Sequence, residues 1–375
     1  MPLKVMTIVG TRPEIIKLSR VIPLIDKFFD HILVHTGQNY DYELNEVFFN
    51  DLGIRQPDHF LNAAKGSAIE SIAEIIKASG EVLEKEMPDA LLLYGDTNSC
   101  LSVLAAKKLK IPIFHMEAGN RCFDQRVPEE INRKIVDHLS DINFVHSEHS
   151  RRYLIDEGLR PEQIIKSGSP MTEVLNKFLP SINKSKILDK LKLSKKDYFL
   201  VSVHREENLD NPENFKDLLD SLNTVATSFN KRIIVSTHPR TRKKLESLND
   251  TSFNPLIEFM KPVGYFDYNN LQINSLCTIS DSGTITEESS LLKFPAITIR
   301  QAHERPEGMD AGTLIMSGLK PDDVINSINI AIEQSREFKN SDIEDYSNQN
   351  ISYQVIKVIQ SYTGYINRTT WKKTL

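Results

Sequence analysis

The chain has few cysteines and no excess of positive charge. Its 375 residues include three cysteines, an odd number, and none of them has Cys-x-x-Cys spacing. A disulfide framework and a structural zinc site are therefore not expected, and a reducing compartment fits best. The formal net charge is -5, and no basic stripe is present that could follow a phosphate backbone. Nucleic acid is therefore not an expected partner.

Several other signals are absent as well. No apolar run approaches the roughly 18 residues of a membrane span, and the first residues show no charged-then-apolar leader pattern. We expect a cytoplasmic protein without a membrane partner. Neither Gly-x-Ser-x-Gly nor a full Gly-x-Gly-x-x-Gly occurs, so the usual signals of a hydrolase or a dinucleotide site are missing. His146 and His149 have metal-like spacing but no nearby cysteine, and we predict neither a metal nor a redox cofactor.

Short β-like runs alternate with helix-length amphipathic stretches along most of the chain. This βαβ rhythm predicts an α/β protein with parallel, doubly wound sheets. The hydrophobic fraction of 40% is enough for two cores, because single cores stop growing near roughly 250 to 300 residues. The rhythm breaks at Ser167 to Pro170, before a polar stretch over 176–197. We predict a first domain over 1–168, a second over 169–351, and a helix over about 352–375 that packs back on the first domain.

The predicted strands are short apolar segments that alternate with the helical stretches. They are Lys4 to Val9, His31 to Thr36, Ala90 to Tyr94, Ile111 to Met116, Ile142 to His146, Tyr198 to Val203, Arg232 to Thr237, Leu256 to Phe259, Leu276 to Ser280 and Ala296 to Ile299.

Two predicted strand-to-helix turns are suited to phosphate. Gly10 to Glu14 follows the first strand, and Asp281 to Glu288 follows the strand that ends at Ser280. Each turn opens a helix whose unpaired amides and dipole favour an anion. The pairing predicts one ligand, a nucleoside diphosphate, held between two domains.

Polar side chains follow many of the predicted strands. In open α/β sheets, ligands bind beyond the carboxyl ends of the strands, so these residues are candidates for one shared site. The alternative is that strands must end in polar turns in any α/β protein. A turn at the end of a strand does not require the carboxylate of Glu117 followed by Gly119, which favours the shared-site interpretation. The strand-end residues are Arg12, Gln38, Asp96, Glu117, His204, His238 and Ser282.

The segment from Pro128 to Leu139 reads as a helix, with proline at its first position. Ile131, Ile135 and Leu139 recur at helical spacing and predict a buried apolar stripe. Glu129 and Arg133 then share the opposite face, either as a surface ion pair or as part of the site.

The second phosphate turn contains two acidic residues with different interpretations. Thr284 and Glu287 have the spacing of a capping box, which gives Glu287 a structural role. Glu288 is placed to accept hydrogen bonds from ribose hydroxyls, or else it stabilises the helix start as an acid. Tyr268 could stack on a base, although aromatics near a helix start are more often core residues.

Taken in order, the motifs resemble those of the non-hydrolysing UDP-N-acetylglucosamine 2-epimerases over nearly the whole chain. The resemblance implies a glycosyltransferase-B type fold with two Rossmann-like domains around a cleft, no cofactor, and a homodimer. The matching segments are Thr7 to Glu14, Tyr94 to Thr97, His115 to Gly119, Pro128 to Arg133, His204 to Glu206, Ser280 to Gly283 and Glu304 to Glu307.

At several positions the chain departs from the usual motifs of this family. These departures resemble one subgroup, the enzymes that form UDP-N-acetyl-L-fucosamine from UDP-2-acetamido-2,6-dideoxy-L-talose for capsule or O-antigen synthesis. UDP-N-acetylglucosamine epimerisation and glycosyl transfer are the alternative activities. The loss of a Gln-His-Arg-Glu stretch predicts no allosteric activation by UDP-N-acetylglucosamine. The departures are Gly37 to Glu43 in its place, Asn120 to Asp124, His204 to Asn208, Thr284 for a second glycine, and Gln301 to His303.

The resemblance also implies roles for particular residues. Carboxylates would remove and return the proton at carbon 2 of the sugar while UDP leaves and returns. A non-catalytic sensor would keep the nucleotide contacts but would not need these acids. The implied catalytic residues are Asp96, Glu117, Glu129 and His204. The implied UDP-sugar contacts are Arg12, Lys17, Arg133, His238, Tyr268, Ser282, Gly283 (through its amide), Thr284, Glu288 and Arg305.

Overall fold

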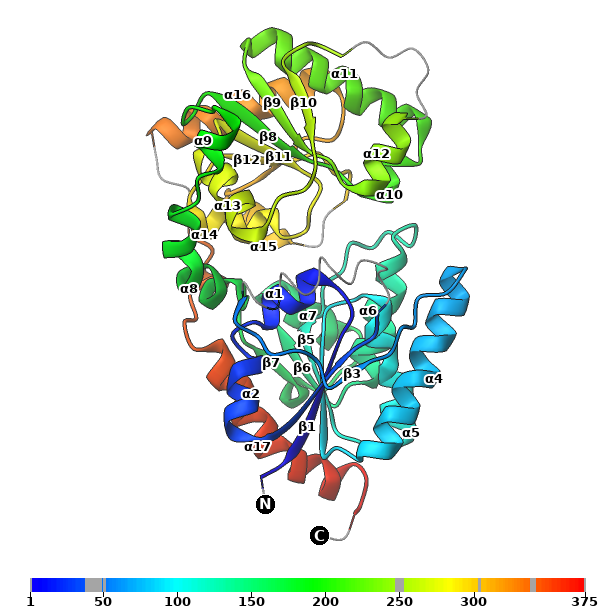
Figure 1. Ribbon diagram of the computed structural model, residues 1–375. Coiled ribbons are helices and arrows are strands. Elements are labelled where there is room, and N and C mark those ends of the chain that lie inside the picture. The colour runs from blue at the N-terminus through cyan, green and yellow to red at the C-terminus, as the bar shows by residue number, and fades with distance from the viewer. Residues whose placement is uncertain are drawn as a thin grey trace. The chain divides into compact units, whose positions relative to one another are not determined.

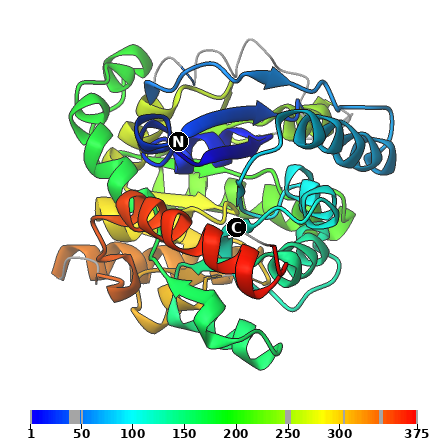
Figure 2. The same ribbon diagram turned by 90° about the horizontal axis from the view of Figure 1, so that it is seen from below.

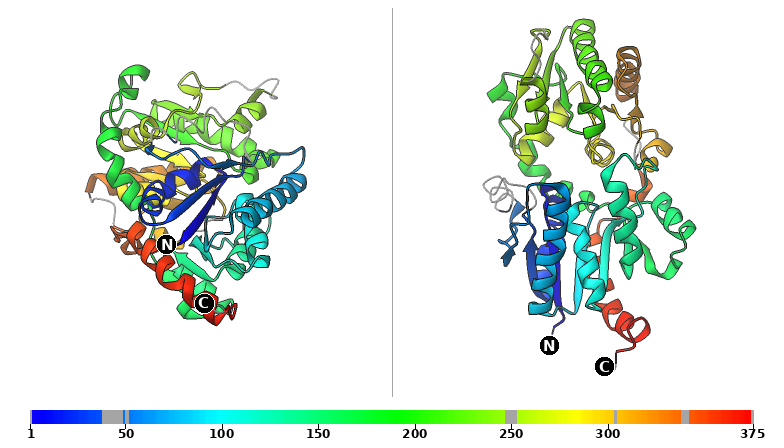
Figure 3. Two further views of the ribbon diagram at one scale, coloured as in Figure 1. Left: turned by 60° about the horizontal axis from the view of Figure 1, so that its bottom comes forward. Right: turned by 90° about the vertical axis from the view of Figure 1, so that its right-hand side faces the viewer.

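The computed structural model describes residues 2–37, 49, 52–246, 253–302, 305–337 and 342–373. The chain divides into two compact units, here called the first and second domains. The first domain comprises Met1–Val174 and Asp345–Leu375, and the second comprises Leu175–Glu344. Each contains a parallel sheet with helices packed against it (Figure 1, Figure 3). The predicted parallel α/β architecture is confirmed.

Seven parallel strands form the described sheet of the first domain, in the order β3-β2-β1-β4-β5-β6-β7. Because the order reverses beside β1, the carboxyl ends of β1, β4 and β5 are neighbours at one edge of the sheet. The strands are β1 (Lys4–Val9), β2 (Asp30–His35), β3 (His59–Phe60), β4 (Ala90–Tyr94), β5 (Ile113–Ala118), β6 (Ile142–Val145) and β7 (Ile164–Lys166).

Helices connect these strands and cover the sheet. Leu83, Val103 and Val136, from three different helices, share one buried cluster with alternate residues of β1, β2, β4 and β5. The helical segments are α1 (Arg12–Leu18), α2 (Ile22–Phe28), α4 (Ala68–Glu86), η1 (Asn98–Ser102), α5 (Val103–Lys108), α6 (Pro128–Leu139), α7 (Glu148–Asp156), η2 (Pro161–Gln163), η3 (Glu344–Tyr346) and α17 (Ile351–Thr369), with α8 (Met171–Asn183) running into the second domain.

The second domain has a described sheet of six parallel strands, in the order β10-β9-β8-β11-β12-β13. The strands are β8 (Tyr198–Ser202), β9 (Arg232–Ser236), β10 (Ile257–Met260), β11 (Cys277–Ser280), β12 (Ala296–Thr298) and β13 (Ile315–Met316). The helices are α9 (Ile187–Leu191), α10 (Glu206–Leu209), α11 (Pro212–Phe229), α12 (Pro239–Glu246), α13 (Tyr265–Asn274), α14 (Ile285–Leu292), α15 (Pro306–Asp310) and α16 (Pro321–Glu337).

Alternation along the strands explains how this second sheet is buried on both faces. Phe199 and Val201 of β8 pack in a core with residues of α11 and α16. Leu200, between them, packs in a second cluster with Leu271 of α13. Successive side chains point to opposite faces of a strand, so a continuous apolar run is what a doubly covered parallel sheet requires.

The predicted strands agree with those observed, with ends that differ by at most two residues. The short strands β3, β7 and β13 were not predicted, because a segment of two or three residues carries no periodicity. The polar stretch over 176–197 contains the end of α8 and the whole of α9. Near the C-terminus, α17 contacts α2, with the rings of Phe28 and Tyr353 6.3 Å apart (Figure 2). In the described parts of the chain, no helix is long and apolar enough to cross a membrane.

Candidate functional site

Two carboxylates of the first domain follow neighbouring strands. Asp96 lies just beyond β4, and Glu117 lies near the end of β5, with Tyr94 and Met116 in register between them. Gly95 has a φ of 79°, which turns the chain sharply after β4. A Cβ built on Gly95 would lie 3.8 Å from Oε2 of Glu117. The Glu117 carboxylate therefore lies close to the turn that carries Asp96.

Glu117 has an unusual backbone conformation. Its φ is 66°, and the register between β5 and β6 shifts between Met116 and Ala118, so Glu117 occupies a β-bulge. The bulge redirects the side chain, whose Oε2 lies 2.7 Å from Nζ of Lys17. Only 13% of the Glu117 side chain and 7% of the Lys17 side chain are exposed. This is a nearly buried ion pair in a strained segment, an arrangement that is common at functional sites.

Asp96 is paired with a second cation. Its Oδ2 accepts from Nε of Arg133 at 2.8 Å, and its backbone carbonyl accepts from Nδ2 of Asn132 at 2.9 Å. Arg133 also donates to Glu130, three residues earlier on α6, at 2.9 Å. Arg133 is therefore a buried link between α6 and the turn after β4, which favours the site interpretation of this residue over a surface ion pair.

The predicted apolar stripe on α6 is wrong. Ile131 is 55% exposed, and Ile135 and Leu139 are only partly buried. The buried face is largely charged instead and includes Glu130, Arg133 and Asp137. Glu129 is half-buried beside this face. The face of α6 that carries Arg133 and Asp137 turns toward the sheet end, where these residues contact Asp96 and His115, and Ile131 is left on the exposed side.

The turn after β1 holds another buried carboxylate. Oε2 of Glu14 accepts from the backbone amides of Gly10 at 2.5 Å and Thr11 at 3.0 Å, which closes a capping box at the start of α1. Oε1 accepts from the hydroxyls of Thr97 and Ser99, which follow β4. Burial raises the pKa of Glu14 to about 7 despite these donors. Arg12, the predicted diphosphate contact, is half-buried in this first helical turn.

In the second domain, Asp281 organises the predicted phosphate turn. It is fully buried and accepts from the backbone amides of His204 and Arg205 at 2.9–3.1 Å. Burial alone would raise the pKa of Asp281, but the His204 charge and these hydrogen bonds hold it below its usual range. Nδ1 of His204 lies 3.1 Å from Asp281, and the His204 ring lies 5.8 Å from that of exposed His238. Three predicted site residues, His204, His238 and Ser282, thus lie around one turn.

The predicted capping box at Thr284 is wrong. Thr284 is the N-cap of α14, but its side chain caps no backbone amide. Its hydroxyl donates instead to Glu288 at 3.1 Å, because the αR backbone of Thr284 does not point the side chain at the helix amides. Glu287 is fully buried and lies 3.8 Å from Nη2 of Arg305.

Glu288 and Tyr268 lie on neighbouring helices. Oε2 of Glu288 accepts from Nε2 of Gln272 at 2.7 Å, and Glu288 is 7% exposed. Tyr268 is partly buried against the cluster that contains Leu200 and Leu271. Burial raises the pKa of Tyr268, and the Glu288 charge adds to the effect. Both residues are therefore held by protein contacts beside the phosphate turn.

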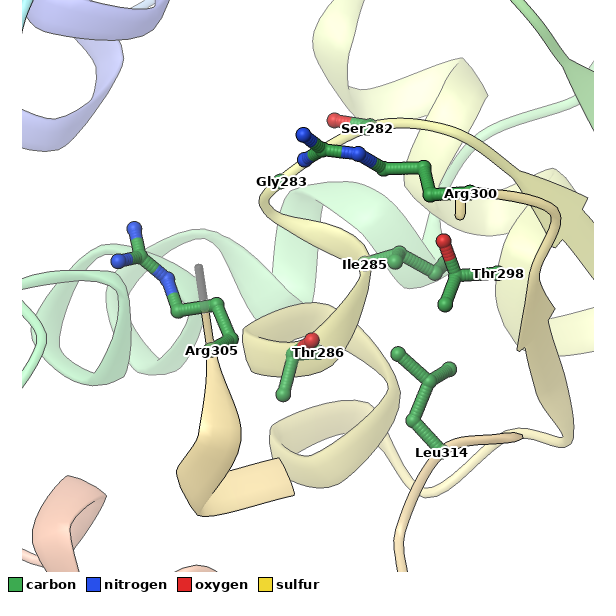
Figure 4. A pocket seen from close by; sticks show the side chains of 8 residues that line it. All are labelled: Ser282, Gly283, Ile285, Thr286, Thr298, Arg300, Arg305 and Leu314. Carbon is green, nitrogen blue, oxygen red and sulfur yellow. The ribbon is translucent and has the colours of Figure 1, made fainter. Parts of the chain in front are cut away.

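A small cavity lies beside this turn (Figure 4). It contains an arginine that sequence reasoning missed: Arg300 follows β12 and extends alongside the Ser282–Gly283 turn. Arg300 and Arg305 are each 3% exposed, which is rare for arginine. The strand-end rule identifies Arg300 if it is applied to the predicted strand that ends at Ile299. The lining residues are Ser282, Gly283, Ile285, Thr286, Thr298, Arg300, Arg305 and Leu314.

Some predicted features are not assembled into sites, or lie outside the described residues. Nε2 of His146 lies 3.2 Å from the hydroxyl of Tyr94, away from His149. Among the residues that the structure describes, no three His, Cys, Asp or Glu side chains are grouped as metal ligands. Gln38, most of the Gly37 to Glu43 segment, His303 and Glu304 lie outside the described residues.

Comparison with known proteins identifies the family. The family model for UDP-N-acetylglucosamine 2-epimerase matches residues 25–360. The chain belongs to the UDP-N-acetylglucosamine 2-epimerase family. A protein of that name from Methanococcus maripaludis is 37% identical, covering 90% of this chain and 94% of its own. A Pseudomonas aeruginosa UDP-2,3-diacetamido-2,3-dideoxy-D-glucuronate 2-epimerase is 33% identical, with 87% and 91% covered.

Solved structures agree with this membership. A UDP-N-acetylglucosamine 2-epimerase from Rickettsia bellii matches with a TM-score of 0.92 and 55% identity, covering 100% of both chains. The Methanocaldococcus jannaschii enzyme, in complex with UDP-N-acetylglucosamine and UDP, matches with a TM-score of 0.87 and 33% identity, covering 96% of this chain and 100% of its own. The protein is therefore an isomerase of the UDP-sugar 2-epimerase type, and its two Rossmann-like domains form a fold of the glycosyltransferase-B type.

Proposed function

We propose that this epimerase inverts carbon 2 of a UDP-2-acetamido sugar by eliminating UDP and adding it back. The observation that carries the proposal is a pair of carboxylates at neighbouring strand ends, each matched with a cation. Asp96 is paired with Arg133, and Glu117 is paired with Lys17. Carboxylates held in place at neighbouring strand ends are suited to take up and return protons.

The chemistry explains why such groups are needed. Carbon 2 has no adjacent carbonyl, so its proton is only weakly acidic. As the bond between carbon 1 and the UDP oxygen breaks, positive charge develops at carbon 1 and acidifies the neighbouring proton. A carboxylate takes that proton, the C–H electron pair forms the C1–C2 double bond, and UDP leaves with the electrons of its own bond.

The second half of the reaction reverses these steps on the other face of carbon 2. A protonated acid returns a proton to that face, and the UDP oxygen adds to carbon 1. Asp96, Glu117 and Glu129 are the proposed acid/base groups, and His204 is proposed to act with them. The overall reaction leaves charge and redox state unchanged, so it consumes no cofactor.

Contacts for the leaving diphosphate are proposed in both domains. In the second domain, Ser282, the Gly283 amide, Arg300 and Arg305 lie around the start of α14, where amides and positive charge favour an anion. Glu288, which is nearly buried on α14, is proposed to accept from ribose hydroxyls. In the first domain, Arg12 lies in the first turn of α1, where the Gly10 and Thr11 amides already donate to Glu14, so its side chain is the proposed contact.

The proposed substrate is UDP-2-acetamido-2,6-dideoxy-L-talose, converted to UDP-N-acetyl-L-fucosamine for capsule or O-antigen synthesis by a cytoplasmic homodimer. The sequence departures at Asn120 to Asp124 and His204 to Asn208 support this choice. The second candidate substrate is UDP-N-acetylglucosamine, because the relatives from M. maripaludis and R. bellii carry the name of that activity.

One experiment separates these substrates. The purified protein is incubated with each UDP sugar in deuterium oxide, without added cofactor, and carbon 2 is followed by proton NMR. Conversion and deuterium uptake with only the 6-deoxy sugar support the first proposal, whereas turnover of UDP-N-acetylglucosamine supports the second. Phosphorus NMR of the same samples detects free UDP, which would accumulate if the enzyme hydrolysed its substrate. Absence of exchange with both sugars would contradict the proposed reaction.

A further inference from the structure

A largely buried charged network lies beside the two carboxylate-bearing turns, and the proposed mechanism does not use it. Its members alternate in sign: His115 on β5, Asp137 on α6, Arg121 in the loop between these elements, and Glu157 after α7. The side chains of His115, Asp137 and Arg121 are at most 1% exposed. Such a cluster is costly to bury unless every charge is matched.

The hydrogen bonds of His115 favour a charged ring. Nδ1 lies 2.9 Å from Oδ1 of Asp137, and Nε2 lies 2.7 Å from the carbonyl oxygen of Gly95. Oδ2 of Asp137 accepts from the Gly119 amide at 3.1 Å and from Nη1 of Arg121 at 2.8 Å, so Asp137 is an ionised acceptor. An ionised Asp137 and the Gly95 carbonyl both accept, so this arrangement favours a proton on each ring nitrogen of His115, as in an imidazolium.

The other charged residues of the network lower the free-energy cost of burying a charge on His115. Arg121 forms two parallel hydrogen bonds with Glu157, at 2.8 and 2.7 Å. The two cations, His115 and Arg121, are thus balanced by the two anions, Asp137 and Glu157. Burial would lower the pKa of His115, but its hydrogen bond and charge interaction with Asp137 raise it above the ordinary value. The interactions with Asp137 thus favour the protonated form of the ring.

The network holds the backbone at both catalytic turns. The Gly95 amide donates to the Met116 carbonyl at 2.9 Å, and the Gly95 carbonyl accepts from His115, so both polar groups of the residue before Asp96 are fixed. Asp137 fixes the Gly119 amide, two residues after Glu117. The left-handed backbone of Glu117 costs free energy and needs such surrounding contacts to persist.

We propose that His115, as an imidazolium, is a positioning residue that fixes the turn of Asp96 relative to the bulge of Glu117. The inference rests on the proposed function, because it assumes that these two carboxylates carry out the proton transfers. His115 touches neither the substrate nor the reacting atoms. Its contribution is geometric, and a misplacement of about 1 Å at such groups can cost about 100-fold in rate.

The chain offers a matched control in His31. The His31 side chain is also only 1% exposed, and its Nδ1 lies 2.6 Å from Asp26 while its Nε2 lies 2.9 Å from Oγ1 of Thr7. His31 lies at the start of β2, at the opposite end of the same sheet from Asp96 and Glu117. Substitution of either histidine removes two side-chain hydrogen bonds, of which those of His31 are less buried, and only those of His115 support the proposed site.

The first test compares His115→Gln with His31→Gln. We expect kcat of His115→Gln to fall about 100-fold, while the dissociation constant for UDP changes less than threefold. His31→Gln should lower the melting temperature to a similar extent but keep kcat within threefold of wild type. Equal kcat values for the two variants, or an unchanged kcat in His115→Gln, would overturn the inference.

A second test is independent of substrate and is read from the wild-type protein, with the variants used only to assign the signal. Proton–nitrogen NMR of the wild-type protein with labelled histidine should show one imidazole with both ring nitrogens protonated at pH 8.5, assigned by its absence from His115→Gln or Asp137→Asn. A His115 that is neutral at that pH overturns the inference, whatever the enzyme acts on. If wild-type protein epimerises neither sugar but retains this imidazolium, the proposed reaction fails while the charge state of His115 stands.

Discussion

Lys17 and Glu117 are separated by 100 residues in sequence, and their charged atoms lie 2.7 Å apart. Lys17 is buried in the last turn of α1, and its Nζ lies 5.3 Å from the centroid of the Tyr94 ring. The ion pair therefore joins α1 to the strained end of β5. A substitution of Lys17 should therefore affect Glu117, a proposed acid/base group.

Lys17→Met should lower kcat by at least tenfold, because it removes the cation beside a nearly buried carboxylate while keeping a side chain of similar length. The affinity for UDP should change less than the rate if the main task of Lys17 is to hold Glu117. Steady-state kinetics and calorimetric titration with UDP measure the two effects. Lys77→Met is the control, because the Lys77–Glu81 pair on α4 is about two-thirds exposed and contributes little.

Asp96→Asn and Glu117→Gln should each retain UDP binding within about threefold and lose turnover by about 100-fold or more, as expected when an acid/base group is removed. Both substitutions keep the shape of the side chain, so Arg133 and Lys17 still have an oxygen to contact. Deuterium exchange at carbon 2 and UDP titration separate chemistry from binding. An equal loss of affinity and rate would contradict the acid/base assignment.

Most of the fold could be predicted from the sequence. Buried strands of a doubly covered parallel sheet are continuous apolar runs, and Ala90–Tyr94 carries that signal along its whole length. The short edge strands His59–Phe60 and Ile315–Met316 carry too little of it. These strands form by pairing with a neighbouring strand, and the local sequence pattern does not predict that pairing.

The site was less predictable, because polar contacts over long sequence distances decide it. On α6, helical periodicity indicated a buried isoleucine stripe, yet the buried face carries Arg133 and Asp137. Their partners, Asp96 and His115, lie 37 and 22 residues away in sequence. Arg300 was missed for a different reason, because the strand-end rule was not applied to the predicted strand that ends at Ile299.

Arg300→Gln should weaken UDP binding by about 10- to 100-fold, the range expected for a lost hydrogen bond between charged groups. Uridine, which lacks the diphosphate, should bind the variant and the wild type equally. Titration of both proteins with both ligands gives the difference. Arg336→Gln is the control, because Arg336 is exposed on α16. If uridine affinity falls as much as UDP affinity, Arg300 does not bind the diphosphate.

Glu288→Gln should weaken UDP binding about tenfold, because a neutral amide accepts hydrogen bonds from ribose hydroxyls less strongly than a carboxylate does. The same substitution should reduce the preference of the enzyme for UDP over 2′-deoxy-UDP. Glu333→Gln, on the exposed surface of α16, should change neither quantity. Unchanged discrimination between the two nucleotides in Glu288→Gln would remove Glu288 from the ribose contact.

Glu14 predicts a pH dependence of stability. Burial raises its pKa from 4.5 to about 7, so the folded state binds a proton that the unfolded state has already released over this range. For an acid with a raised folded-state pKa, the free energy of unfolding decreases as pH rises from about 4.5 to 7 and is constant above that range. At about 1.36 kcal/mol per pKa unit, the decrease is about 3 kcal/mol.

Glu14→Gln can still accept from the Gly10 and Thr11 amides, but it cannot ionise. Urea unfolding of both proteins between pH 5 and 8 should therefore show the variant gaining stability relative to wild type by about 2 kcal/mol as pH rises. A constant difference across this range would mean that Glu14 is ionised in the folded protein throughout, with its four donors outweighing burial.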